Sequence, residues 1–251
     1  MRNRDFRQVD VFTAVPYKGN PVAVVLDGEG LSEAEMQAFA NWTNLSETTF
    51  VLPATDPAAD YRVRIFTPKA ELPFAGHPTL GTAHAVTEAW LATPRDGRLV
   101  QQCAVGLVEL TVGDSGLSFR LPRHALQELT DPEATAWIGA AVTGSAAAVD
   151  VGPVWLVAEL AEVAALEALA HDPARLAAYY LPRGMTGATL YAVEGGRVVV
   201  RSFAPGDGIA EDPVCGSGNG AVAAFRLAAG QVRAGDSYVA SQGRQVGRDG
   251  Y

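Results

Sequence analysis

An internal repeat constrains the fold of this chain more than any other feature of its sequence. The segment Arg64–Pro68 (RIFTP) recurs at Arg201–Pro205 (RSFAP), and acidic residues follow each copy: Glu71 after the first, Glu211 and Asp212 after the second. Three matching letters in five can arise by chance, but the same order of features continues downstream of both copies. Repetition of a whole series of elements indicates duplication, so we predict two domains of similar fold.

A small apolar helix is predicted after each of these acidic segments, and a glycine precedes each helix. The two helices are His77–Trp90 after Gly76 and Ser217–Ala229 after Gly216. Because neither segment has a polar face, both helices are expected to be enclosed by other elements. We therefore predict an α/β (α+β) fold of two pseudo-symmetric domains, each a mixed β-sheet wrapped around a central helix.

The length of the chain suits this division. Its 251 residues, 48% of them hydrophobic, can build two cores of ordinary size. Turn-forming residues gather near Gly113–His124, where the boundary is expected. We predict an N-terminal domain of residues 1–118 and a C-terminal domain of residues 119–251.

Local patterns predict further elements. The residues Ser32 and Glu35 form a capping box, so a helix should begin there and run to about Asn41. An amphipathic helix is expected over Ala161–Ala170. Runs rich in apolar, β-branched and aromatic residues predict strands at Gln8–Thr13, Val22–Leu26, Thr49–Leu52, Tyr61–Phe66, Leu107–Val112, Val154–Val157, Ala188–Val193 and Val198–Phe203.

The charge and the cysteines narrow the classes of function. The formal net charge of −9 argues against nucleic acid and anionic membrane as partners. No stretch reaches the roughly 20 apolar residues of a membrane span, and no apolar run of signal-peptide length follows the first charges, so a cytoplasmic location is expected. A reducing compartment argues against a disulfide between Cys103 and Cys215. These cysteines and the four dispersed histidines also lack the spacing of metal ligands, so no metal site is predicted.

The starts of the two small helices are candidate anion sites. A helix N-terminus offers free N–H groups and a partial positive charge, and Gly76-His77 and Gly216-Ser217 leave the backbone bare there. If a pseudo-twofold axis relates the domains, both starts should face one cleft and hold a small anionic substrate. In the alternative interpretation the glycines only allow close packing. The Gly216–Gly220 segment lacks the residues that complete a nucleotide-binding loop, so nucleotide binding is not predicted.

Glu47 is a candidate acid/base. It follows Ser46 at the start of an apolar strand, where partial burial would raise its pKa and allow proton exchange near neutrality. Taken alone, a glutamate in this position is more often a surface cap.

Three more side chains have two possible roles. His77 is either a core or capping imidazole or a group that binds substrate and carries a proton. Asp212 either complements the dipole of the following helix or acts in the site. Cys215 is either a structural thiol or one activated by the helix start.

Several blocks of the sequence together resemble the PhzF family of phenazine-biosynthesis proteins. The blocks appear in order over nearly the whole chain, and they are Tyr17–Val24 (YKGNPVAV), Asn44–Thr48 (NLSET), Arg64–Gly81 (RIFTPKAELPFAGHPTLG), Glu211–Ser217 (EDPVCGS) and Gln242–Arg248 (QGRQVGR). This resemblance strengthens the catalytic interpretation of Glu47.

The resemblance implies the diaminopimelate-epimerase fold, a homodimer and a cofactor-free proton shift, as in the isomerisation of trans-2,3-dihydro-3-hydroxyanthranilate. By this resemblance, Glu47 moves the proton. The groups implied to bind or assist are Ser46, Gly76, His77, Asp212 and Ser217.

Two departures from related proteins affect the prediction. Epimerases of this fold carry a cysteine before each central helix, but here the first position is Ala75, so a two-thiol epimerase is excluded. The second position is Cys215, so a mechanism with Glu47 and Cys215 as two bases is an open alternative. Relatives usually continue past the closing motif, and a last strand that returns to the N-terminal domain is expected to be missing after Tyr251.

We therefore predict an isomerase that transfers a proton on a small carboxylate-bearing substrate, with no cofactor. Glu47 is the predicted acid/base, and His77 and Asp212 assist it. Substrate binding is assigned to Ser46, Gly76, Cys215, Gly216 and Ser217. The alternatives are an amino-acid or hydroxy-acid epimerase that uses Glu47 with Cys215, and a non-catalytic protein that binds a small ligand.

Overall fold

The computed structural model describes residues 2–114, 116–121 and 124–251, and its contacts divide the chain into two compact units. The first unit contains the N-terminal residues up to Val11 and residues 20–120, and the second contains residues 12–19 and 121–251. The return of residues 12–19 to the second unit has a visible cause, because Tyr251 N donates to Phe12 O at 2.9 Å and Asp249 N to Lys18 O at 2.9 Å. No sequence feature pointed to this exchange.

Part of the predicted boundary region, namely Ser115, Pro122 and Arg123, lies outside the described residues. The division into independent domains 1–118 and 119–251 stays a prediction.

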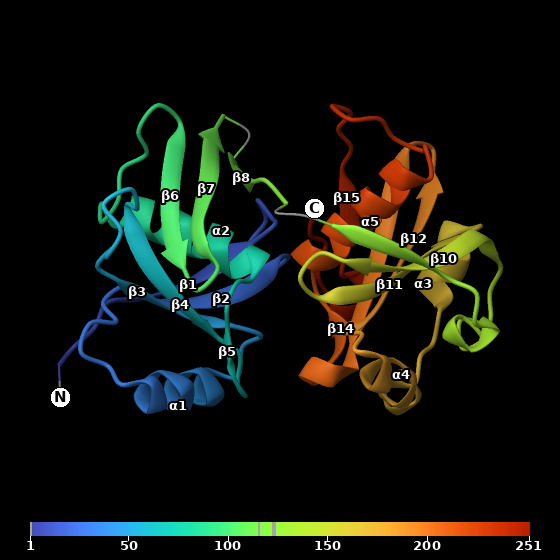
Figure 1. Ribbon diagram of the computed structural model, residues 1–251, viewed down its shortest axis with the longest axis horizontal. Coiled ribbons are helices and arrows are strands. Elements are labelled where there is room, and N and C mark those ends of the chain that lie inside the picture. The colour runs from blue at the N-terminus through green and yellow to red at the C-terminus, as the bar shows by residue number, and fades with distance from the viewer. Residues whose placement is uncertain (1, 115, 122–123) are drawn as a thin grey trace. The chain divides into compact units, whose positions relative to one another are not determined.

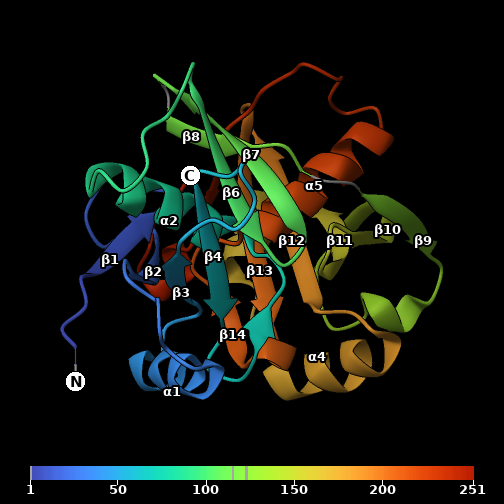
Figure 2. The ribbon, with the colours of Figure 1, turned by 60° about the vertical axis from the view of Figure 1, so that its left-hand side comes forward.

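The first unit is built on one mixed sheet, whose strands β1 to β4 follow one another across it (Figure 2). The order is β1-β2-β3-β4-β6-β7-β8, and β5 pairs with β4 off this path. Its strands are β1 (Phe6–Val11), β2 (Asn20–Val25), β3 (Thr48–Leu52), β4 (Tyr61–Phe66), β5 (Glu71–Leu72), β6 (Arg98–Cys103), β7 (Gly106–Gly113) and β8 (Gly116–Phe119).

The second unit is built on another mixed sheet, of order β14-β13-β12-β11-β10-β9, with β15 paired to β13. Its strands are β9 (Ala125–Leu129), β10 (Val142–Asp150), β11 (Val154–Leu160), β12 (Gly187–Glu194), β13 (Arg197–Ala204), β14 (Ile209–Asp212) and β15 (Ala240–Gln242).

The two sheets repeat the same series of pairings. In the first, β1–β2 is antiparallel, β2–β3 parallel, β3–β4 and β4–β5 antiparallel, and β4–β6 parallel. In the second, β10–β11, β11–β12, β12–β13, β13–β14 and β13–β15 have the same directions in the same order. The duplication inferred from the sequence is therefore confirmed at the level of topology.

A central helix follows the acidic strand in each unit: α2 (Gly76–Glu88) after β5 and α5 (Gly216–Ala228) after β14 (Figure 1). Each helix packs closely on its sheet through a glycine. A Cβ at Gly81 would overlap the side chain of Val22, and one at Gly218 would lie 2.6 Å from Thr189 Oγ1. The small residues of both segments are thus explained by close contact between helix and sheet.

The expectation that these helices have no exposed face was too strong. His84 and Glu88 are exposed on α2, and Leu227 and Ala228 are exposed at the end of α5. Most other residues of both helices are buried or half-buried. Helix α2 therefore keeps a narrow exposed strip, whereas α5 is exposed only at its C-terminal end.

The outer faces of the sheets carry different helices. The first unit has α1 (Glu33–Thr43) between β2 and β3, and Ser32 and Glu35 form the predicted capping box. The second has α3 (Val163–Ala168) and α4 (Pro173–Tyr180) between β11 and β12. The helix predicted over Ala161–Ala170 is shorter than expected, because the chain turns to an extended conformation at Leu169. Short 3-10 turns lie at Pro132–Ala134, Leu181–Arg183, Pro205–Asp207 and Arg244–Val246.

α1 and α2 lie on opposite faces of the first sheet. Thr49 Oγ1 accepts a hydrogen bond of 2.8 Å from Thr82 of α2, whereas the next residue, Phe50, packs with Met36 and Ala40 of α1. Successive strand residues point to opposite faces, which separates the two helices.

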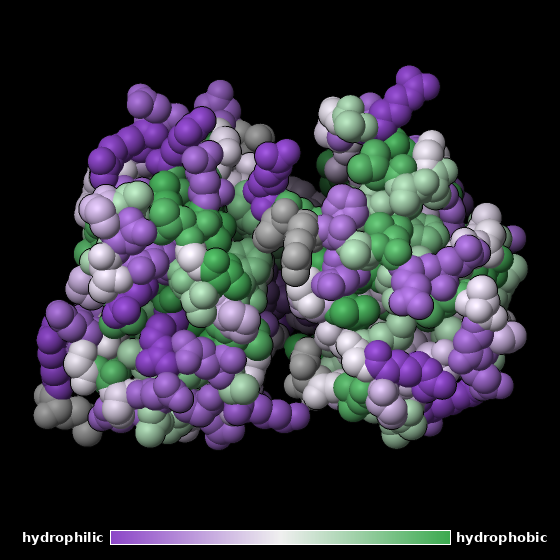
Figure 3. All heavy atoms as spheres, in the orientation of Figure 1, coloured by the Kyte–Doolittle hydropathy of each residue, from purple (hydrophilic) through white to green (hydrophobic). Residues whose placement is uncertain are grey.

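Hydrophilic and hydrophobic side chains are interspersed on the visible face of each unit (Figure 3). No helix in the described ranges is long and apolar enough to cross a membrane.

Candidate active site

Glu47 lies in the turn between α1 and β3. Helix α1 ends at Thr43, its C-cap Asn44 adopts the left-handed conformation with φ of 55°, and the chain then turns towards the buried strand. The carbonyl of Glu47 accepts a hydrogen bond of 3.3 Å from Ala23 N of β2, which holds the turn on the sheet. The side chain of Glu47 is only 14% exposed, so it is not the surface cap that the sequence alone favours.

His77 lies beside Glu47. It is the second residue of α2, its side chain is 8% exposed, and its Nε2 lies 3.4 Å from Glu47 Oε2. The two residues are brought together because β3 runs beneath α2, as the hydrogen bond between Thr49 and Thr82 also shows. The structure thus places two of the predicted catalytic residues in direct contact.

His77 is a neutral imidazole at physiological pH. Burial lowers the pKa of His77 to about 4, although a hydrogen bond to the backbone of Pro21 acts in the opposite direction. Within the described residues Nε2 has no hydrogen-bond partner, so the nitrogen bonded to Pro21 is Nδ1. A neutral ring with its proton on Nδ1 presents Nε2 as an acceptor towards Glu47. The pair is therefore suited to share one proton and is not a fixed ion pair.

Asp212 ends strand β14 of the second unit and is 9% exposed. Its Oδ1 accepts a hydrogen bond of 3.0 Å from Val214 N, which closes a tight turn across Pro213 into helix α5. Asp212 is thus held by the turn that starts the helix.

Cys215 is the N-cap of α5. Its Sγ accepts a hydrogen bond of 3.3 Å from Gly218 N and lies 3.5 Å from Ser217 Oγ. The hydroxyl of Ser217 accepts a hydrogen bond of 3.2 Å from Trp155 Nε1. The thiol and the hydroxyl therefore lie side by side at the helix start, and Cys215 has a capping role that the sequence analysis left open.

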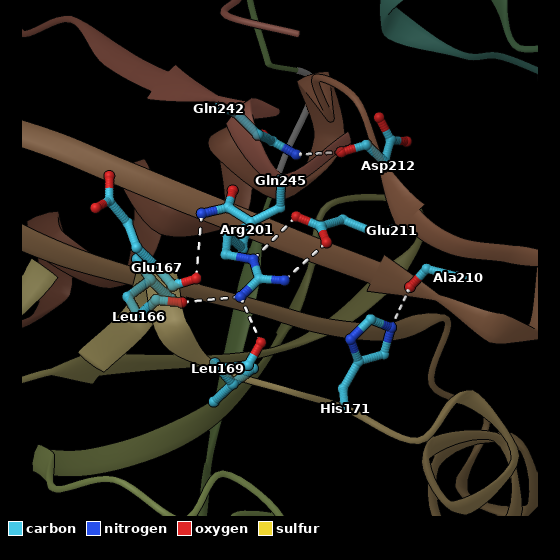
Figure 4. Close-up of polar contacts among 10 residues, drawn as sticks. All are labelled: Leu166, Glu167, Leu169, His171, Arg201, Ala210, Glu211, Asp212, Gln242 and Gln245. Atoms are coloured by element: carbon cyan, nitrogen blue, oxygen red, sulfur yellow. Dashed lines mark hydrogen bonds and ion pairs between the residues drawn. The ribbon is translucent and has the colours of Figure 1, made fainter. Parts of the chain in front are cut away.

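Gln242 supports this helix start and was given no role from the sequence. Its Oε1 accepts bonds from Cys215 N at 3.1 Å and Asn219 Nδ2 at 2.9 Å. Its Nε2 donates to Asp212 O at 3.0 Å (Figure 4). The available signal was its position as the first residue of the closing QGRQVGR block. Trp155 and Pro21 were also missed, because only the fold brings them to Ser217 and His77.

The remaining predicted residues lie beside these groups. Ser46 directly precedes Glu47 and is half-buried, and Gly76 and Gly216 are the first residues of α2 and α5. The predicted residues thus form one group in the first unit, Ser46, Glu47, Gly76 and His77, and one in the second, Asp212, Cys215, Gly216 and Ser217. Among the residues with defined positions, no group of three or more His, Cys, Asp and Glu side chains is arranged to hold a metal ion.

Comparison with known proteins identifies the family. The model of the phenazine biosynthesis-like proteins, PhzC-PhzF, matches residues 9–251. The chain belongs to the PhzF family. The resemblance noted in the sequence is thereby confirmed.

Curated relatives of this PhzF protein include isomerases. The trans-2,3-dihydro-3-hydroxyanthranilate isomerase of Pseudomonas aeruginosa is 36% identical over 250 residues, which cover 96% of this chain and 86% of that protein. Antisense-enhancing sequence 1 of Schizosaccharomyces pombe is 38% identical over 262 residues, covering 99% and 88%. The PhzF protein described here is an enzyme of the isomerase class.

A solved structure shares the fold. The phenazine biosynthesis protein of the PhzF family from Bacillus anthracis superposes with a TM-score of 0.86 at 23% identity, covering 100% of this chain and 89% of that one. The predicted fold class, an α/β protein with two sheets that each pack on a central helix, is confirmed.

Proposed function

We propose that this PhzF protein moves a proton within a small carboxylate-bearing substrate without a cofactor, and that Glu47 is its acid/base. The substrate would resemble trans-2,3-dihydro-3-hydroxyanthranilate, the compound named for the relative from Pseudomonas aeruginosa. The observation that supports this proposal most is the contact of 3.4 Å between Glu47 and a neutral His77.

The pair suits the two halves of a proton shift. Glu47 as carboxylate would take a proton from a substrate carbon and, as carboxylic acid, would return it to another position. Between the two transfers, Nε2 of His77 would accept a hydrogen bond from the protonated carboxyl group and hold Glu47 in place. A cationic histidine would instead stabilise the carboxylate and weaken it as a base, so the low pKa of His77 serves the mechanism.

The start of α2 would bind the charge of the substrate. The first turn of a helix has N–H groups without intrahelical partners, and Ala75 offers no side-chain cap to them. We propose that the backbone at Gly76 binds the substrate carboxylate or a neighbouring polar group, and that Ser46 binds the substrate beside it.

Residues of the second unit are proposed to act on the same substrate, and here the support is the family resemblance. Asp212 would orient the substrate and assist the proton, and Gly216, Ser217 and Cys215 would bind its polar groups. The turn of Asp212 and the hydrogen bond from Trp155 to Ser217 hold these side chains in fixed positions.

A second candidate is an amino-acid or hydroxy-acid epimerase that uses Glu47 and Cys215 as its two bases. The hydrogen bond from Gly218 N to Cys215 Sγ favours it, because the same donor would stabilise a thiolate. We rank it second because serving as a helix cap already explains the position of the thiol. The non-catalytic alternative is disfavoured because relatives of this chain are named as isomerases. A cytoplasmic location and a homodimer complete the proposal.

Substitution of Glu47 tests the mechanism directly. The variant Glu47→Gln keeps the size of the side chain but cannot transfer a proton, so it should lose roughly two to four decades of rate. The measurement is incorporation of deuterium from solvent into trans-2,3-dihydro-3-hydroxyanthranilate during turnover. Glu88→Gln, on the exposed strip of α2, is the matched control and should keep the rate of the unmodified enzyme. Full activity in Glu47→Gln would refute the role of Glu47.

A further inference from the structure

A pocket of about 470 Å³ opens on the face of the first sheet that carries α1. It lies between the ends of β3 and β4 and the loop that leads into α1. Its apolar walls are formed by Leu31, Met36, Leu52 and Pro53. The central helix α2 packs on the opposite face, so this pocket is separate from the contact between Glu47 and His77.

Arg62 is the cationic side chain of this pocket that has no partner. Its Nε is shielded from solvent, and the guanidinium makes no hydrogen bond or ion pair with any residue that the structure describes. Arg64 also lines the pocket, but its charge is already paired, because it binds Glu33 at 2.8 Å and Glu71 at 2.7 Å. A counter-charge stabilises a cation whose Nε is withdrawn from water, so Arg62 is the feature of this pocket that points to an anionic ligand.

The duplicated unit shows that this arginine is not a requirement of the fold. Val199 occupies the matching position, two residues before Arg201 as Arg62 lies two residues before Arg64. Val199 is buried in the apolar cluster that contains residues of α3 and α4. In the second unit this place on the sheet is therefore filled by hydrophobic packing, and in the first it carries an unpaired charge beside a pocket.

We propose that this pocket binds a small monocarboxylate with an apolar body. The planar guanidinium of Arg62 matches the two oxygens of a carboxylate, and the walls at Leu31, Met36 and Leu52 suit a hydrocarbon group. Glu29 also lines the pocket, and its charge disfavours ligands with two negative charges. This site is independent of the proposed reaction.

Phenylacetate is a suitable probe, because it joins one carboxylate to one apolar ring. Isothermal titration of the full chain should show binding, and Arg62→Gln should weaken it about tenfold or more, as expected for loss of a charge-assisted hydrogen bond. Phenylacetamide, which has the same shape without the charge, should bind the unmodified protein more weakly by a similar factor. NMR spectra of methyl groups should show shifts at Met36 and Leu52.

The controls make either outcome decisive. Arg98→Gln removes an exposed arginine of β6 that pairs with Glu109, and it should not change the affinity for phenylacetate. Arg62→Lys should keep part of the affinity, and if Arg62→Gln fails to fold, the comparison with phenylacetamide still measures the need for charge. Equal binding of phenylacetate and phenylacetamide, no binding, or methyl shifts that spare Met36 and Leu52 would each overturn the proposal.

Discussion

The two copies of the repeated segment carry the same arginine in different surroundings. Arg64 and Arg201 each lie 5.1 Å from the ring centre of the phenylalanine two residues later, Phe66 or Phe203. Each also binds the glutamate of the following strand through two nitrogens. The side chain of Arg64 is 27% exposed, however, and that of Arg201 is 4% exposed.

The covering helices account for this difference. In the first unit α1 contributes Glu33, an exposed second carboxylate, to Arg64. In the second unit α3 ends above the sheet, and the carbonyls of Leu166 and Leu169 accept hydrogen bonds from Arg201 Nη1 at 2.9 and 2.7 Å (Figure 4). One local motif thus forms a partly solvated ion pair in one unit and a buried network in the other. The energy of a sequence motif depends on what the fold places over it.

The largest expected effect comes from removing the buried arginine. Arg201→Met leaves Glu211 and the carbonyls of Leu166 and Leu169 buried without this partner, which should cost about 3–5 kcal/mol in the free energy of unfolding. Arg64→Met should cost about 0–1 kcal/mol, because water can solvate Glu33 and Glu71. Urea unfolding of both variants measures the difference. Equal losses would show that burial does not distinguish the two copies.

A smaller effect is expected on the pH dependence of the free energy of unfolding, and it should arise from His77 in the first unit. The pKa of His77 is about 4 in the folded protein, below its usual value of 6.5 because of burial. The unfolded chain therefore binds a proton more readily, so stability is lost as the pH falls from about 6.5 towards 4, by up to about 3 kcal/mol. Ser217 occupies the matching position in the second unit and does not titrate in this range.

Unfolding curves between pH 4 and 7 test this effect. His77→Gln should remove most of the pH dependence in this window, whereas His84→Gln, which changes an exposed histidine on the same helix, should leave it in place. A pH dependence unchanged by His77→Gln would contradict the low pKa of this residue.

The smallest expected effect concerns the thiol at the start of α5. Cys215→Ser replaces one acceptor for Gly218 N with another that is well suited to an N-cap, so the rate of solvent-deuterium incorporation should stay within about tenfold of the unmodified enzyme. A loss as large as that in Glu47→Gln would move the assignment to the epimerase with two bases.

Some elements lay beyond prediction because their local composition is misleading. Strand β9 has the sequence ALQEL, whose residues favour helix, and β10 contains the run GSAAA, which has low β propensity. Both strands form because β10 pairs with β11 on one side and with β9 on the other. Cross-strand pairing is a tertiary interaction and leaves no periodic pattern in such short, mixed segments.

The sequence by itself determined the duplication, the two central helices, the class of fold and the family, because these depend on local patterns and on blocks of residues in a fixed order. It also identified Glu47 and His77 as candidates. Only the tertiary structure decided that His77 is neutral and touches Glu47, that Arg201 is buried while Arg64 is partly exposed, and that Arg62 lies unpaired beside a pocket. The physical reason is that burial and proximity set pKa values and ion-pair energies, and both depend on the path of the whole chain.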